Sequence, residues 1–229
     1  MATDFAARLD AVVARIQAAE RHFQRPPGSV ELLVVSKTQP AAAIAAAAAA
    51  AGQIRFGENY LQEACDKMTK LAVLDLEWHF IGPVQANKTR LIAERFAWVH
   101  SVDRLKIAER LNAQRPDDLP PLNVCLQVNI SGEPSKHGLD ASELPATACA
   151  VAKLPRLQLR GLMAIPAPAT EFAAQREPLA RLRRLREELI AEGLTLDTLS
   201  MGMSDDLEAA IAEGSTLVRI GTAIFGPRT

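Results

Sequence analysis

Lys37 is the residue of this chain whose type and position best suit covalent chemistry. It closes the apolar run 32–35 and lies in the segment Ser36-Lys37-Thr38-Gln39-Pro40. Burial at the end of a strand disfavours the ammonium ion and lowers the pKa of the amine, which can then form a Schiff base with a carbonyl group. A strand-end lysine can also extend its amine to solvent, so the other residues must decide between these two interpretations.

Polar side chains recur at the ends of the segments that are predicted to be strands. These ends carry Lys37, Asn59, His79, Ser101, Asn129, Met163, Ser200 and Arg219. In a parallel barrel the carboxyl ends of the strands meet at one mouth, where binding and catalytic residues collect. Lys37 and Arg219 would make this mouth electropositive and suited to an anion that carries a carbonyl group.

The C-terminal segment has the features of a phosphate site. Ser200 ends the seventh predicted strand, and Gly221 and Thr222 follow the eighth. Barrels of this kind hold phosphates at these two loops, through backbone N–H groups that a glycine leaves accessible and through hydroxyl donors. With Lys37, the pattern indicates a phosphorylated carbonyl ligand: a sugar phosphate, as in Schiff-base aldolases, or pyridoxal 5′-phosphate. Composition and spacing leave both open.

The strands that would position these residues alternate with helices. Strands are expected at 31–36, 54–57, 77–81, 97–101, 122–130, 157–163, 197–200 and 217–220. Helices are expected at 4–24, 40–51, 59–71, 86–95, 103–114, 141–153, 170–192 and 205–213, with a short one near 222–225. Asp103 and Ser142 are expected to cap two helices, and Gly193 to end the longest one.

This alternation predicts one α/β domain over residues 1–229. The expected fold is a single (β/α)₈ barrel of the TIM type, with an extra N-terminal helix within residues 1–28 packed on it. A doubly wound sheet is the alternative, and it is disfavoured because no glycine-rich dinucleotide turn follows the first strand.

Composition excludes several other classes of protein. The formal net charge of −1 gives no electrostatic reason to expect nucleic acid or an anionic membrane as a partner. The longest apolar run, 41–51, is too short to span a bilayer, and the N-terminus lacks the apolar core of a signal peptide. The three cysteines have no metal-site spacing. We therefore expect a cytoplasmic protein without a metal.

Several long motifs lie between the first strand and the C-terminus. They are Val35-Ser36-Lys37-Thr38, Phe56-Gly57-Glu58-Asn59-Tyr60, Trp78-His79-Phe80-Ile81-Gly82-Pro83-Val84-Gln85, Asn87-Lys88, Gln127-Val128-Asn129-Ile130, Ser135-Lys136-His137-Gly138, Arg160-Gly161-Leu162-Met163 and the run 199–226. Together they resemble the pyridoxal phosphate homeostasis protein family. The resemblance covers nearly the whole chain from the first strand onward, and it implies a barrel like the N-terminal domain of alanine racemase.

The resemblance also implies a role for each site residue. Pyridoxal 5′-phosphate (PLP) would be held as an aldimine on Lys37, with Arg219 facing the pyridine nitrogen. The remaining positions would be Ser200, Gly221 and Thr222 around the phosphate, Asn59 near the ring, His79 in the pocket wall, and Lys136 as a second lysine for cofactor transfer. One departure is Gln39, where many relatives have another lysine.

The same residues favour a carrier over an enzyme. An arginine is always charged and only donates hydrogen bonds, so Arg219 would keep the ring nitrogen unprotonated and the ring a weak electron sink. The barrel ends the chain at Thr229, and Tyr60 is its one tyrosine, so the second domain and tyrosine base of racemases are not expected. The resemblance implies a monomeric, non-catalytic carrier or regulator in intracellular PLP homeostasis and amino and keto acid balance, which could supply PLP-dependent apoenzymes. A racemase-like enzyme and a Schiff-base aldolase are the alternatives.

Overall fold

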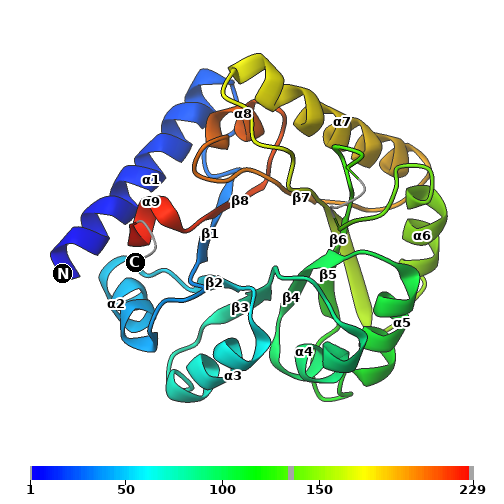
Figure 1. Cartoon of the computed structure of the whole chain (residues 1–229), viewed down its shortest axis with the longest axis horizontal. Helices are drawn as coiled ribbons and strands as arrows, with labels where there is room; N and C mark the ends of the chain where they lie inside the picture. Colours follow the sequence, from blue (N-terminus) through cyan, green and yellow to red (C-terminus); the bar gives the residue numbers. More distant parts are fainter. Residues whose placement is uncertain (1, 134–136, 227–229) are drawn as a thin grey trace.

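Eight parallel strands close into a barrel, in the order β1 to β8, in a computed structural model that describes residues 2–133 and 137–226 (Figure 1). The strands are β1 (Glu31–Val35), β2 (Arg55–Glu58), β3 (Glu77–Phe80), β4 (Trp98–Val102), β5 (Leu122–Gln127), β6 (Leu157–Met163), β7 (Thr198–Ser200) and β8 (Leu217–Ile220). Pairing of β1 with β8 closes the ring. All eight predicted strands are present, so the prediction of a TIM-type barrel is confirmed.

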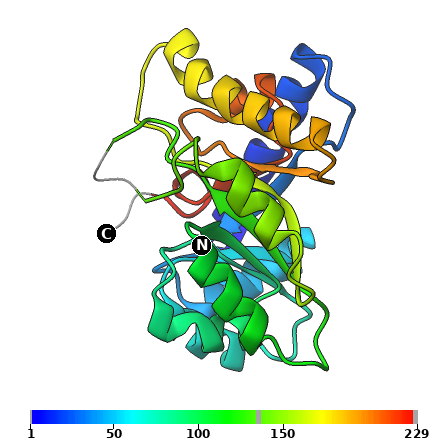
Figure 2. The ribbon, with the colours of Figure 1, turned by 90° about the vertical axis from the view of Figure 1, so that its right-hand side faces the viewer.

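Helices form an outer ring around the strands, and Figure 2 shows this ring from the side of α5 and α6. The helices are α1 (Ala2–His22), α2 (Ala41–Ala51), α3 (Leu61–Lys70), α4 (Thr89–Arg95), α5 (Leu105–Gln114), α6 (Leu144–Val151), α7 (Phe172–Ala191), α8 (Leu207–Ala212) and α9 (Thr222–Phe225), with a 3₁₀ turn at Ala86–Lys88. None of the helices in the described ranges is both long and apolar enough to cross a membrane.

The predicted caps of two helices are wrong. Helix α5 begins after Arg104, because the carboxylate of Asp103 accepts a hydrogen bond from Arg104 at 2.8 Å instead of bonding to the helix. Helix α6 begins after Glu143. If Ser142 were the cap, the third helical residue would be Pro145, which has no N–H to donate. Gly193 lies two residues beyond α7 with a φ of 99°, as expected of a residue that ends a helix.

Helix α1 lies against α2, α8 and α9 (Figure 1). Its apolar stripe is buried, and the residues of this stripe are Leu9, Val12, Ile16 and Ala19. On the polar side, Arg15 donates to both carboxylate oxygens of Glu208 on α8, at 3.0 and 2.9 Å. Sequence periodicity predicts such a one-sided helix because the buried positions recur every three or four residues.

Alternate residues of each strand face two environments. The outward-facing Phe80 on β3 packs edge-on against Phe96, with ring centroids 5.3 Å apart, in the main core under the helices. The inward-facing Trp98, Cys125 and Met163 form a separate buried cluster. Branched aliphatic side chains usually fill the inside of such barrels. Here His79, His100, Ser200 and Arg219 are also buried inside and hydrogen-bonded to one another, so the interior has a role besides packing.

Strand β7 contacts β8 through the shortest ladder of the barrel. One residue pair is in register, Ser200 with Leu217, whereas β5 and β6 have six. Further backbone bonds, from Thr216 N–H to the Leu199 carbonyl and from Met201 N–H to the Leu217 carbonyl, and side chains complete this seam. Thr216 accepts a hydrogen bond from Leu199 N–H at 2.9 Å, and the Ser215 hydroxyl donates to the carbonyl of Met201 at 2.7 Å.

Candidate functional site

Lys37 lies two residues beyond the end of β1, at the mouth of the barrel. The residue is half-buried, and it lines a small hollow together with Gly221 and Thr222, which directly follow β8. A Cβ atom at Gly221 would lie 3.0 Å from the carbonyl oxygen of Val35. Close packing against the end of β1 therefore favours a glycine here. The structure thus brings together three of the residues that the sequence predicts for the site.

The loop that carries Lys37 rests on a buried ionic network. The amine of Lys67 on α3 donates to the carbonyl of Ser36 at 2.8 Å and to the carboxylate of Glu58 at 2.7 Å. The Ser36 hydroxyl also donates to Glu58, at 2.6 Å. Burial raises the pKa of the Glu58 carboxyl, and the hydrogen bond from Lys67 opposes this shift. The network fixes the backbone on the N-terminal side of Lys37.

A second carboxylate fixes the other side of the lysine. The Thr38 N–H donates to Glu63 on α3 at 2.6 Å, and Glu63 also accepts from Lys67. Thr38 has a φ of 65°, a left-handed conformation that a β-branched residue rarely adopts. Because the surrounding bonds hold this strained residue, the direction of the loop at Lys37 is determined by α3.

Asn59 follows β2 at the same mouth and carries a buried acceptor. Its Oδ1 atom has no hydrogen-bond partner among the described residues. The backbone of Asn59 packs directly against Gly82, where a Cβ atom would lie 2.3 Å from the Asn59 carbonyl oxygen. A buried polar atom without a hydrogen-bond partner costs free energy. A bound ligand that donates a hydrogen bond to Asn59 Oδ1 would remove this cost.

Arg219 lies on β8 with its side chain inside the barrel. It donates to the carbonyl and hydroxyl oxygens of Ser200, at 2.5 and 2.8 Å, and to the carbonyl of Ala164 at 3.0 Å. These bonds use two of its three nitrogens. Burial lowers the pKa of Arg219 to about 10, so its guanidinium remains charged at neutral pH.

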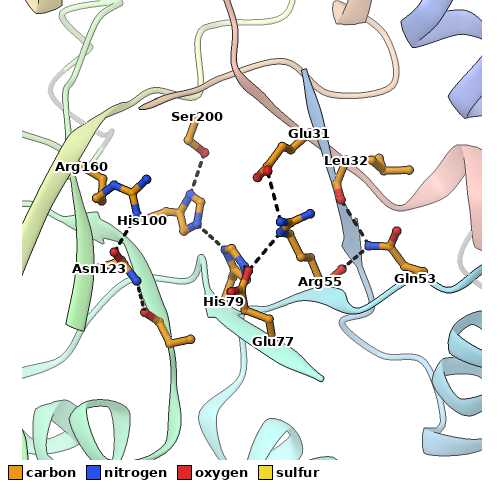
Figure 3. Close-up of polar contacts among 11 residues, drawn as sticks. Glu31, Leu32, Gln53, Arg55, Glu77, His79, His100, Asn123, Arg160 and Ser200 are labelled. Atoms are coloured by element: carbon orange, nitrogen blue, oxygen red, sulfur yellow. Dashed lines mark hydrogen bonds and ion pairs between the residues drawn. The ribbon is translucent and has the colours of Figure 1, made fainter. Parts of the chain in front are cut away.

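His79 lies inside the barrel, further from the mouth than the strand ends where the sequence interpretation put it. It is in register with Trp98, the first residue of β4, and its ring stacks on that indole with centroids 5.4 Å apart. It is 1% exposed, and it makes hydrogen bonds to His100 at 2.8 Å and to Glu77 at 2.9 Å (Figure 3). His100 is in turn 2.7 Å from the Ser200 hydroxyl.

Two further residues that the sequence interpretation named are Lys136 and Gln39. Lys136 lies outside the described residues. Gln39 lines the same hollow as Lys37. Within the described ranges, no three His, Cys, Asp or Glu side chains are grouped as metal ligands would be.

Comparison with known proteins gives this site a context. The family model described as "Alanine racemase, N-terminal domain" matches residues 7–229. The pyridoxal phosphate homeostasis protein of Pseudomonas aeruginosa is 64% identical over 217 residues, which cover 95% of this chain and 93% of that protein. The protein of the same name from Escherichia coli K12 is 57% identical over 228 residues, covering 98% and 97%. The chain belongs to the pyridoxal phosphate homeostasis protein family.

Solved structures agree with membership of the pyridoxal phosphate homeostasis protein family. PipY from Synechococcus elongatus, in a structure with PLP bound, is 40% identical, has a TM-score of 0.85, and the match covers 97% of this chain and 100% of PipY. PipY without PLP is 41% identical with a TM-score of 0.86 and the same coverage. Alanine racemase from Corynebacterium glutamicum is 19% identical with a TM-score of 0.72 over 96% of this chain and 62% of the racemase, which shows a shared fold.

The sequence interpretation missed the groups that support the site. Lys67 could have been suspected because Glu63 precedes it by four residues on an amphipathic helix, the spacing of an ion pair. His100 could have been suspected because it alternates with Trp98 on the inward face of β4. Nothing in the sequence indicates that His100 contacts Ser200, which is 100 positions away.

Proposed function

We propose that this chain holds PLP covalently on Lys37 and acts as a carrier or regulator in intracellular PLP homeostasis and amino and keto acid balance. The observation that carries the proposal is the shared hollow of Lys37, Gly221 and Thr222 at the mouth of the barrel. Lys37 and the expected phosphate cradle line one hollow, which supports a phosphorylated aldehyde as the ligand. The PipY relative, whose structure contains PLP, supports the choice of ligand over a sugar phosphate.

The residues present fit this cofactor. Asn59 supplies a buried amide oxygen that has no partner in the part of the chain that the structure describes, and it follows β2, the neighbour of β1. Gly221 and Thr222 offer backbone N–H and hydroxyl donors for the phosphate, and Arg219 keeps a permanent positive charge beneath the mouth. PLP supplies an aldehyde that condenses with amines and a ring that can accept electrons.

The proposal of a carrier rests on what the pocket residues can do with protons. A racemase needs a proton donor on each face of its substrate. Lys37 can serve one face, while Tyr60, the one tyrosine of the chain, is 55% exposed. Arg219 donates hydrogen bonds only, so it would hold a ring nitrogen unprotonated. These features favour holding and delivering the cofactor over catalysis, with the racemase-like enzyme as the alternative.

Further parts of the proposal concern the cell. PLP-dependent apoenzymes are the proposed recipients, Lys136 is the proposed transfer lysine, and the protein is proposed to act as a cytoplasmic monomer. The formal net charge of the chain, −1, gives no electrostatic support for a nucleic-acid partner.

Borohydride reduction tests the covalent site. After incubation with PLP, reduction and peptide mass mapping should place the pyridoxyl group on Lys37. The variant Lys37→Arg should lose the label, whereas Lys153→Arg, which changes an exposed lysine, should keep it. Labelling at another lysine in the wild-type chain would contradict the proposal.

Deuterium exchange tests the carrier role with the same preparation. The loaded protein, incubated with each L-amino acid in deuterated water, should show negligible exchange at Cα. Fast exchange that is lost in Lys37→Arg would contradict the carrier proposal and support a racemase-like enzyme.

A further inference from the structure

A chain of buried hydrogen bonds crosses the barrel interior from the N-terminal ends of the strands to Ser200 (Figure 3). Glu77, the first residue of β3, contacts His79 Nε2 at 2.9 Å. His79 Nδ1 contacts His100 Nε2 at 2.8 Å, and His100 Nδ1 contacts the Ser200 hydroxyl at 2.7 Å. Strands β4 and β7 are not neighbours in the barrel, so the last bond passes through the interior.

The outer end of this chain is charged and reaches solvent. Arg55 donates to Glu77 at 3.1 Å and pairs with Glu31 at 3.1 Å. The side chains of Arg55, Glu77 and Glu31 are 34%, 35% and 48% exposed. The hydrogen bond from His79 lowers the pKa of the Glu77 carboxyl, so Glu77 is an anion at neutral pH. It can therefore only accept a hydrogen bond from His79.

The charge on Glu77 sets the direction of every bond that follows. Burial lowers the pKa of both His79 and His100, so each ring is neutral and has one donor and one acceptor nitrogen. His79 donates from Nε2 to Glu77, so its Nδ1 must accept from His100 Nε2. His100 Nδ1 must then accept the hydroxyl hydrogen of Ser200.

The opposite direction is excluded by the same geometry. A reversed chain would place the lone pair of His79 Nε2 against the Glu77 carboxylate at 2.9 Å, with no hydrogen between them. The other charged groups that face the chain, Arg219 and Arg55, only donate and cannot remove this conflict.

We propose that Glu77, acting through His79 and His100, commits the hydroxyl hydrogen of Ser200 to the barrel interior, so that Ser200 positions Arg219 and is not a phosphate donor. The Ser200 oxygen accepts from Arg219 at 2.8 Å, and its carbonyl accepts from the same nitrogen. This changes the role that family resemblance implies for Ser200. Glu77, His79 and His100 become positioning residues for the guanidinium beneath the mouth.

The direction of the bonds is measurable without any ligand. In apo protein labelled with ¹⁵N-histidine, the imidazoles assigned to His79 and His100 should both be neutral with hydrogen on Nε2. The exposed His22 and His137 provide internal references. Hydrogen on Nδ1 of His100 would overturn the proposal.

A matched pair of variants tests whether Glu77 sets the direction. Glu77→Gln removes the charge, and its amide can donate or accept, so both directions become allowed and the ¹⁵N signals of His100 should shift or double. Glu31→Gln removes a carboxylate at the same end that contacts Arg55 but neither histidine, and it should leave those signals unchanged. Unchanged His100 signals in Glu77→Gln would overturn the role of Glu77.

Ligand binding distinguishes a Ser200 that positions Arg219 from a Ser200 that donates to the phosphate. This experiment rests on the proposed function. Ser200→Ala should weaken PLP and pyridoxal by similar factors, roughly two- to ten-fold, because the guanidinium of Arg219 loses one hydrogen-bond acceptor and is positioned less firmly. Thr222→Val should weaken PLP alone, since pyridoxal has no phosphate. A loss confined to PLP in Ser200→Ala would overturn the reassignment. Failure of wild-type protein to bind either ligand would instead refute the proposed function and leave the apo measurement valid.

Discussion

Lys67 is a single residue whose hydrogen bonds hold the loop that carries Lys37. The side chain is 6% exposed, and its three oxygen partners come from the loop after β1, the end of β2 and its own helix α3. Its partner Glu58 is fully buried. A buried carboxylate that loses its cation is left charged and unpaired, which is among the largest penalties a single substitution produces.

Lys67→Met should therefore lower the free energy of unfolding by about 3 kcal/mol, measured by urea titration. The control Arg104→Met removes a half-exposed cation paired with Asp103 and should cost less than about 1 kcal/mol. Adding Glu58→Gln to Lys67→Met should restore part of the loss, because the buried charge is removed as well. Equal costs for Lys67→Met and Arg104→Met would show that the network does not stabilise the fold.

The same scale shows how far the site can be predicted from the chain. Lys37, Gly221 and Thr222 meet as expected, because the ends of parallel strands must lie at one mouth. The depth of His79 and the bonds of Ser200 are not predictable from periodicity, which indicates the face of a strand but neither height nor partner. Those bonds depend on where β4 and β7 lie across the ring, and this is a property of the closed barrel.

At the scale of elements, hydrophobic patterning predicts which segments are strands and which are helices, but it does not predict their first and last residues. All eight strands are present, yet β5 ends at Gln127 and not at 130. The caps at Asp103 and Ser142 fail for local reasons, a competing arginine and a proline without an N–H. Element ends depend on such single contacts, whereas element type depends on many residues together.

Helix α1 offers a matched test of how firmly an added element is joined to the barrel. Val12 is 2% exposed and Val13 is 37% exposed, so the two differ in burial and not in type. Val12→Ala should lower the free energy of unfolding by about 2 kcal/mol, and Val13→Ala by less than about 1 kcal/mol. Urea unfolding followed by circular dichroism measures both. Similar small costs would mean that α1 separates before the barrel unfolds.

For the whole molecule, the two buried imidazoles make stability depend on pH. In the unfolded chain, His79 and His100 take up protons near pH 6.5, but burial lowers their pKa in the folded chain. The unfolded chain therefore binds more protons below about pH 6.5, and the free energy of unfolding falls as the pH decreases. Each histidine contributes at most about 1.4 kcal/mol per pH unit.

Urea titrations at pH 7.5, 6.5 and 5.5 should show this decline. Burial raises the pKa of the Glu58 carboxyl. Between the ordinary pKa of a glutamate and this raised pKa, the folded chain binds a proton that the unfolded chain has released, which opposes the decline. Glu58→Gln should therefore make the decline steeper. A free energy of unfolding that is constant or rises toward pH 5.5 in this variant would show that the imidazoles are charged inside the barrel.

The short ladder between β7 and β8 has a consequence for how the barrel opens. This seam has one register pair and backbone hydrogen bonds from the N–H groups of Thr216, Met201 and Arg219. Fewer ladder bonds must break together here than between β5 and β6, so we expect its backbone amides to exchange with solvent sooner than those of β5 and β6. Arg219 and Ser200 join the two strands across this seam. A ligand that engages Arg219 would therefore slow amide exchange in β7 and β8 more than in β5 and β6, and occupancy of the mouth would determine how often the ring opens.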